Sequence, residues 1–132
     1  MIHAYTGTAV RAAEKPLLKA GQGEALMRRA AWGLAVGVVR ELRSHGPVAG
    51  STVAALVGTG NNGGDALWAL SFLRHRGVDA VAVPTGDRMH EAGLHALRRA
   101  GGRVLDRIPD DAVLLIDSVL GTGARGVWEP PP

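Results

Sequence analysis

Residue types that suit the binding of a charged ligand follow an apolar stretch near the middle of the chain. Residues 53–57 are apolar and β-branched at both ends, which predicts a buried strand. The pattern Gly58-x-Gly60-x-x-Gly63 comes next, and residues 66–76 predict a helix. This order of strand, glycine-rich turn and helix is typical of anion-binding sites. The backbone N–H groups of the turn and the positive end of the helix dipole both point at the anion.

Two common nucleotide-binding motifs fit this turn poorly. The glycine spacing matches a dinucleotide-binding motif, but the match alone is weak because the chain has 19 glycines. The usual companion is an acidic residue at the tip of the next strand. That strand, predicted at 78–83, is followed by Pro84 and Thr85, with Asp79 too early and Asp87 too late. An NAD-dependent oxidoreductase is therefore a weaker alternative, and a P-loop is excluded because no Gly-Lys-Ser/Thr follows the glycines.

The segment Asn61-Asn62-Gly63-Gly64-Asp65 is the most unusual part of the turn. Asn and Gly tolerate left-handed backbone angles, so we expect a sharp bend that holds two amide oxygens and a carboxylate. These groups suit a hard cation, a sugar or a nicotinamide. The alternative is structural: Asn62 supplies a turn conformation and Asp65 caps the following helix.

A second group of candidate residues stands at the end of another predicted strand. Residues 112–116 are all apolar, which predicts a central parallel strand, and Asp117 follows at its tip. Ligands of parallel sheets bind beyond the carboxyl ends of the strands, so Asp117 is expected to converge with the glycine turn. A cation shared with Asn62 would compensate its charge. The alternative is a cap or turn contact to Gly121 or Thr122.

The remaining pattern supplies the elements that must position these residues. Apolar residues recur at helical spacing over 24–43, which predicts a core-facing helix. A further helix is predicted at 89–100, a short edge strand at 104–105, and a first helix at 9–20 that is kinked at Pro16 or begins there. Strands that alternate with helices imply right-handed βαβ units and a parallel sheet, an α/β fold.

Composition narrows the class of protein. The 132 residues suit one domain or part of one, and 46% of them are hydrophobic, which argues against disorder. No cysteine is present, so disulfides and thiolate zinc sites are excluded, and a cytoplasmic location is expected. We expect no secretory leader and no membrane association, because no apolar stretch approaches ~20 residues. The net charge is +3 but aromatics are only 4%, which argues against nucleic-acid binding as the main function.

Three segments resemble one known family. The stretch from Asn61 to Asp65, and the stretch Leu115-Ile116-Asp117-Ser118-Val119-Leu120-Gly121-Thr122-Gly123, resemble signatures of the NAD(P)H-hydrate epimerase family (the YjeF N-terminal domain). Residues 24–31 are similar to its Leu-Met-Glu-Arg-Ala-Gly helix, with Arg28 in place of Glu and Ala31 in place of Gly. The order and spacing of the three agree across residues 10–126.

The resemblance implies a fold, a reaction and a site. The fold would be a Rossmann-like three-layer αβα sandwich with a mostly parallel sheet. The reaction would be epimerisation between the R and S forms of hydrated NADH and NADPH, in repair of nicotinamide cofactors. The family binds K⁺, and by motif match Asn62 and Asp117 would be its ligands. The substrate-binding residues would be Asn61, Asn62, Gly63, Gly64, Asp65, Gly121, Thr122, Gly123, Ala124, Arg125, Gly126 and Val127.

The chain departs from the family pattern at its end. The family has a later Val-Asp-x-Pro-Ser-Gly-type motif, whose Asp looks catalytic and whose Ser helps to bind K⁺, and residues 1–132 contain none. We therefore expect the N-terminal part of a single epimerase-like domain, with activity in a parent protein rather than in these residues alone. A homodimer and a fused ADP/ATP-dependent dehydratase domain are further expectations. The alternative function is a non-catalytic nucleotide- or RNA-binding module of the same fold.

Overall fold

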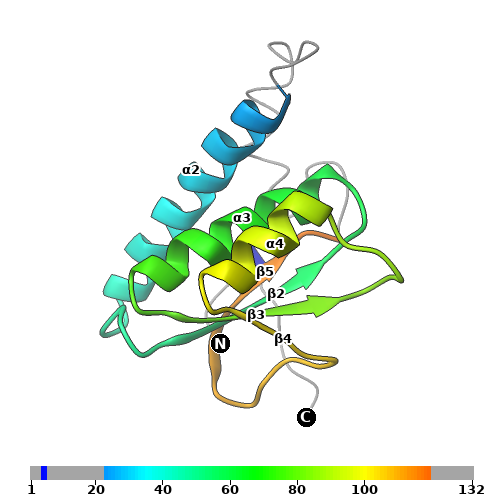
Figure 1. Ribbon diagram of the computed structural model, residues 1–132. Helices are drawn as coiled ribbons and strands as arrows, with labels where there is room; N and C mark the ends of the chain where they lie inside the picture. Colours follow the sequence, from blue (N-terminus) through cyan, green and yellow to red (C-terminus); the bar gives the residue numbers. More distant parts are fainter. Residues whose placement is uncertain (1–3, 6–22, 120–132) are drawn as a thin grey trace.

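A parallel sheet runs through the structure, a computed structural model that describes residues 4–5 and 23–119 (Figure 1). Its strand order is β1-β5-β2-β3-β4, and every pairing is parallel. The strands are β1 (Ala4–Tyr5), β2 (Thr52–Val57), β3 (Asp79–Pro84), β4 (Arg103–Val104) and β5 (Ala112–Asp117). The described helices are α2 (Gly23–Arg43), α3 (Asn61–His75) and α4 (Glu91–Arg99).

Most predicted elements are confirmed to within one or two residues. The helix predicted at 24–43 is α2, the helix at 89–100 is α4, and the strands at 53–57, 78–83 and 112–116 are β2, β3 and β5. The short strand expected at the edge is β4, which pairs with β3 and stands last in the order of the described strands. The helix predicted at 9–20 lies outside the described residues. No helix within 23–119 combines the length and the apolar character that a membrane span requires.

The three described helices all lie on one face of the sheet (Figure 1). Alternate residues of β2 point to opposite faces, as strand geometry requires. Val53, Ala55 and Val57 join the core under the helices, whereas Ala54 packs on the other face with Leu115. The prediction of an α/β fold with a parallel sheet is confirmed. A second helical layer is not among the described helices.

Helix α2 is built to cover its neighbour α3. Its apolar positions recur along one face, so Ala30, Leu34 and Val38 are almost completely buried while Arg28 and Arg40 are exposed. Each buried Leu or Val side chain contributes roughly 1.5–3 kcal/mol relative to an exposed one. Because α3 is held in place by α2 and by the sheet, the polar residues at its start have a fixed support.

The strand order changes direction beside β2. From β2 the chain moves outward through β3 to the edge strand β4, and it then returns to place β5 on the opposite side of β2. The register pairs Leu56 with Asp117, so the carboxyl ends of β2 and β5 are adjacent. In open α/β sheets this is the place where ligands bind.

Candidate functional site

The turn between β2 and α3 is shorter than the sequence predicted. Helix α3 begins at Asn61, five residues earlier than expected, after an extended Gly60 with φ −96° and ψ −159°. The expectation of a sharp bend with left-handed asparagines is therefore wrong. Among the described residues no non-glycine residue has a positive φ. Both asparagines lie in the first turn of α3, at the positive end of the helix dipole.

Close packing, rather than unusual backbone angles, explains the two glycines that follow. A side chain on Gly63 would overlap the carbonyl oxygen of Gly58. A side chain on Gly64 would come within 2.7 Å of the Met27 sulfur and 2.9 Å of the His90 ring. The start of α3 can approach the preceding turn, α2 and the start of α4 only because these positions carry no Cβ.

The structural alternative for Asp65 is also wrong. The helix is preceded by Gly60, which forms no side-chain capping bond, and Asp65 lies at the fifth helical position. The Asp65 side chain is 1% exposed. It belongs to the buried part of α3 and cannot cap the helix start.

The end of β5 meets the glycine turn through Ser118. The hydroxyl of Ser118 donates a hydrogen bond to the Leu56 carbonyl at 2.6 Å and accepts one from the Gly58 N–H at 3.2 Å. Gly58 must also be small, since a Cβ there would be 2.9 Å from the Ser118 carbonyl oxygen. Two segments about sixty residues apart are thus joined at one point, and the expected convergence of the two motifs is confirmed for the part that the structure describes.

Asp117 lies at this junction and is largely buried. The residue is 9% exposed, and its Oδ1 accepts a hydrogen bond from the Val119 N–H at 2.9 Å. This is a turn contact of the kind that the structural alternative required, although Gly121 and Thr122 lie outside the described residues. The contact orients the carboxylate at the strand tip and occupies one position on Oδ1.

A third strand end completes the floor of the site. The Thr85 backbone N–H and hydroxyl both donate to the Val57 carbonyl, at 3.1 and 2.9 Å. The next residue, Gly86, is so close to Thr59 that a Cβ would be 2.8 Å from its methyl group. The loop after β3 is therefore fixed against the glycine turn.

Two of the described residues carry oxygen atoms of the kind that a hard cation prefers. Asn62 is half-buried and immediately precedes Gly63, which packs on Gly58. Asp117 immediately precedes Ser118, which bonds to the same Gly58. An amide oxygen and a carboxylate oxygen are ligands that hard cations such as K⁺ prefer. That the pair binds a cation together stays a prediction, and the predicted segment from Gly121 to Val127 lies outside the described residues.

Sequence analysis gave no role to two residues that the structure places here. Ser118 lies inside a quoted motif, but a serine after a strand gives no signal of which carbonyl it will bond. His90 precedes α4, where its Nδ1 accepts a hydrogen bond from the Gly93 N–H at 3.1 Å. Histidine is an uncommon residue at this position, so the pattern offered no capping signal.

Comparison with known proteins identifies the family. Residues 23–131 match the family model described as "YjeF-related protein N-terminus". The chain belongs to this family. The match includes all three described helices and both motifs of the site.

Named relatives in the YjeF-related family are longer than this chain. The "Bifunctional NAD(P)H-hydrate repair enzyme Nnr" of Mycobacterium tuberculosis is 47% identical in an alignment that covers 98% of this chain and 28% of the relative. The "NAD(P)H-hydrate epimerase" of Microbacterium testaceum is 40% identical over 92% of this chain and 47% of the relative. The chain thus spans between about a quarter and about a half of the relatives named here.

A solved structure supports the fold. The crystal structure of the yeast protein ynu0 superposes with a TM-score of 0.69 at 21% sequence identity, covering 98% of this chain and 59% of the yeast chain. At this identity the likeness concerns the fold alone. It shows that the arrangement of sheet and helices is shared well beyond the bacterial relatives.

Proposed function

We propose that the protein interconverts the R and S epimers of hydrated NADH and NADPH. The observation that carries this proposal is the junction of Gly58 with Ser118, which brings the Asn61 and Asp117 segments to one sheet edge. The relatives named as NAD(P)H-hydrate epimerase and repair enzyme support the same reaction. They also favour it over the alternative of a non-catalytic nucleotide- or RNA-binding module.

The described residues are assigned to binding rather than to proton transfer. The amino end of α3 begins at Asn61, and the positive end of its helix dipole suits the pyrophosphate of a dinucleotide. The side-chain amides of the two asparagines suit hydroxyl or carboxamide groups. The segment from Gly121 to Val127 is proposed as the second substrate-binding strip, on the resemblance to the family motif.

A potassium ion is part of the proposal. Asn62 and Asp117 would hold it with their amide and carboxylate oxygens, because both flank the contact between Gly58 and its neighbours. The ion, when bound, supplies a positive charge next to an anionic substrate and to a largely buried carboxylate. Asp117 would help to hold the ion in place, and the Val119 N–H fixes the position of its carboxylate.

The test is an epimerisation assay on the protein in its full natural length. A single epimer of hydrated NADH is incubated with the protein, and both epimers are followed by chiral-resolved chromatography. We expect the mixture to equilibrate faster than it does without protein. A rate equal to the spontaneous one would overturn the proposal.

A matched pair of variants locates the reaction. Asp117→Asn removes a carboxylate at the carboxyl end of β5, whereas Asp79→Asn removes one at the amino end of β3. We expect a loss of activity of at least tenfold for Asp117→Asn, the size of one lost charge-assisted contact, and little change for Asp79→Asn. Equal losses in the two variants would mean that the carboxyl edge of the sheet is not the site.

Partners and location complete the proposal. The mycobacterial relative is named a bifunctional enzyme, and this supports a fused dehydratase part in the whole protein. We further propose a homodimer acting in the cytoplasm. Light scattering of the purified full-length protein would show whether it is a dimer.

A further inference from the structure

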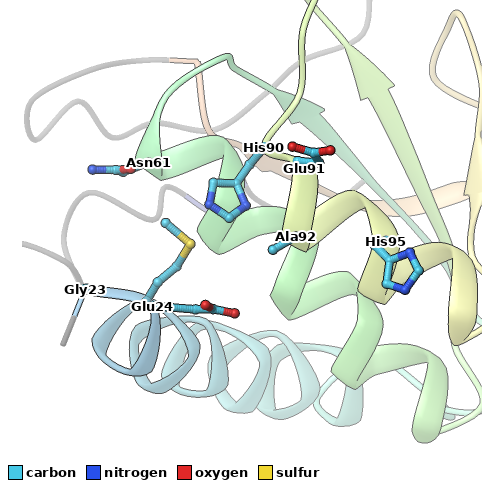
Figure 2. A pocket seen from close by; sticks show the side chains of 8 residues that line it. Gly23, Glu24, Asn61, His90, Glu91, Ala92 and His95 are labelled. Atoms are coloured by element: carbon cyan, nitrogen blue, oxygen red, sulfur yellow. The ribbon is translucent and has the colours of Figure 1, made fainter. Parts of the chain in front are cut away.

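A hollow of about 730 Å³ lies beside the glycine turn, between the starts of α2, α3 and α4 (Figure 2). Asn61 contributes to its wall, so the hollow is continuous with the proposed substrate site. Its other side chains are Glu24, Met27, His90, Glu91 and His95. Figure 2 shows the His90 ring near the middle of this group, with Asn61 on one side and Glu91 on the other.

The hydrogen bond at the start of α4 determines the tautomer of the His90 ring. The Gly93 N–H can only donate, so the Nδ1 that receives it at 3.1 Å must carry a lone pair. The ring hydrogen is therefore on Nε2. Because Nδ1 is engaged with the helix, Nε2–H is the polar group that the ring can offer to the hollow.

Two glycines hold the His90 ring in place. A Cβ on Gly64 would come within 2.9 Å of the His90 Cγ, and a Cβ on Gly93 would come within 3.3 Å of its Nδ1. The Met27 sulfur lies against the same face of Gly64. The ring thus rests between α3 and α4 next to a thioether, and its orientation is set by packing as well as by the cap.

The lining indicates which part of a dinucleotide the hollow would accept. Within the described part of the chain the lining holds no Lys or Arg, whereas Glu24 and Glu91 add negative charge, so the described lining disfavours phosphate. The hollow offers neutral hydrogen-bond donors at His90 and Asn61, carboxylate acceptors and a polarizable thioether. Such a set of groups suits a heteroaromatic base and ribose hydroxyls. The volume falls in the range of small-molecule sites.

We propose that this hollow binds the adenosine half of hydrated NADH, with His90 Nε2–H as a hydrogen-bond donor to it. This inference rests on the proposed function, because it assigns one end of that substrate. The pyrophosphate would then pass the start of α3 at Asn61. The hydrated nicotinamide would lie toward Asp117.

The test replaces the donor but keeps the helix cap. In His90→Asn the shorter side chain still accepts from the Gly93 N–H, because Asn is a strong capping residue, but it no longer reaches into the hollow. We expect the KM for hydrated NADH to rise about three- to tenfold, the effect of one lost neutral hydrogen bond, with kcat within about twofold of its original value. His45→Asn, at the end of α2 and remote from the hollow, is the matched control and should leave KM unchanged.

Fragment binding separates this subsite from the reaction itself. ADP-ribose carries the adenosine and pyrophosphate, whereas nicotinamide mononucleotide lacks adenosine, and calorimetry gives the Kd of each. His90→Asn should raise the Kd for ADP-ribose by about three- to tenfold and leave the Kd for the mononucleotide unchanged. If ADP-ribose binding depends on His90 while the original protein shows no epimerisation, the subsite stands and the proposed reaction fails. Unchanged KM and Kd in a variant with an unchanged Tm, or equal weakening of both fragments, would overturn the subsite.

Discussion

The backbone N–H of Gly58 donates a hydrogen bond to the Oγ of Ser118 across 3.2 Å, and the same hydroxyl donates to the Leu56 carbonyl at 2.6 Å. One small side chain thus joins the ends of β2 and β5. Ser118 is only 4% exposed, so few water molecules could replace it as a partner. The geometry of the proposed site depends on this hydroxyl, although it has no assigned contact with substrate.

Replacement of Ser118 with alanine should lower the free energy of unfolding by about 1–3 kcal/mol, because it leaves the Gly58 N–H without its partner. Urea denaturation monitored by circular dichroism measures the change. The control is Ser44→Ala, whose exposed hydroxyl bonds to the Glu41 carbonyl within α2, and it should change stability by less than about 0.5 kcal/mol. Similar values for the two variants would show that the junction does not support the fold.

Alanine at Gly63 should destabilise the protein far more than alanine at Gly60. The new methyl group at Gly63 would overlap the Gly58 carbonyl oxygen, whereas at Gly60 nothing lies within 4 Å. We expect Gly63→Ala to lower the free energy of unfolding by about 1–3 kcal/mol, as at other overpacked sites. Gly60→Ala should lower it by less than about 1 kcal/mol. Thermal unfolding of both variants gives the comparison, and a reversed order would contradict the steric explanation.

Potassium should stabilise the protein more than lithium does at equal ionic strength. An ion that binds only the folded state raises Tm by mass action, and equal ionic strength keeps general screening constant. The difference should disappear in Asp117→Asn and persist in Asp79→Asn. Differential scanning fluorimetry across a series of KCl and LiCl concentrations measures it. Identical curves for the two salts in the original protein would contradict a potassium site.

The ion pair at the sheet edge should matter little. Arg103 makes two hydrogen bonds to Asp79, at 3.1 and 2.7 Å, but the side chains are 48% and 38% exposed, so water screens the pair. Arg103→Gln should lower the free energy of unfolding by less than about 1 kcal/mol. The hydrogen bond and the charge of Asp79 raise the pKa of Arg103, so its stabilising contribution is present below the normal arginine pKa and is lost only as pH rises through the raised value. Urea melts between about pH 6 and about pH 9 should therefore show a constant effect of this variant.

Sequence patterns predicted the scaffold well because buried faces require apolar residues at regular spacing along the sequence. The buried face of α2 follows helical spacing, and the all-apolar run in β5 matches a strand that lies between two neighbours in the sheet. The position of Asp117 at a strand tip then followed from the rule for parallel sheets. These features depend on contacts along one element or on simple topology.

The start of α3 could not be predicted in the same way. Asn and Gly have low helix propensity, so Asn61 to Gly64 favoured a bend. The structure keeps them helical because Gly63 must approach Gly58 and Gly64 must approach Met27 and His90. Those contacts come from other elements, so local helix propensity cannot predict them. The role of Ser118 was hidden for the same reason.

We expect the contact between Gly58 and Ser118 to form late in folding. The units β2-α3-β3 and β3-α4-β4 join neighbours in sequence, and Thr52 meets Asp79 only 27 residues away. The bond from Gly58 to Ser118 spans 60 residues, and such distant contacts form late because their loop must be closed first. The junction of the two motifs therefore requires β5 to be docked beside β2. A ligand that binds across this junction would stabilise the docked position of β5.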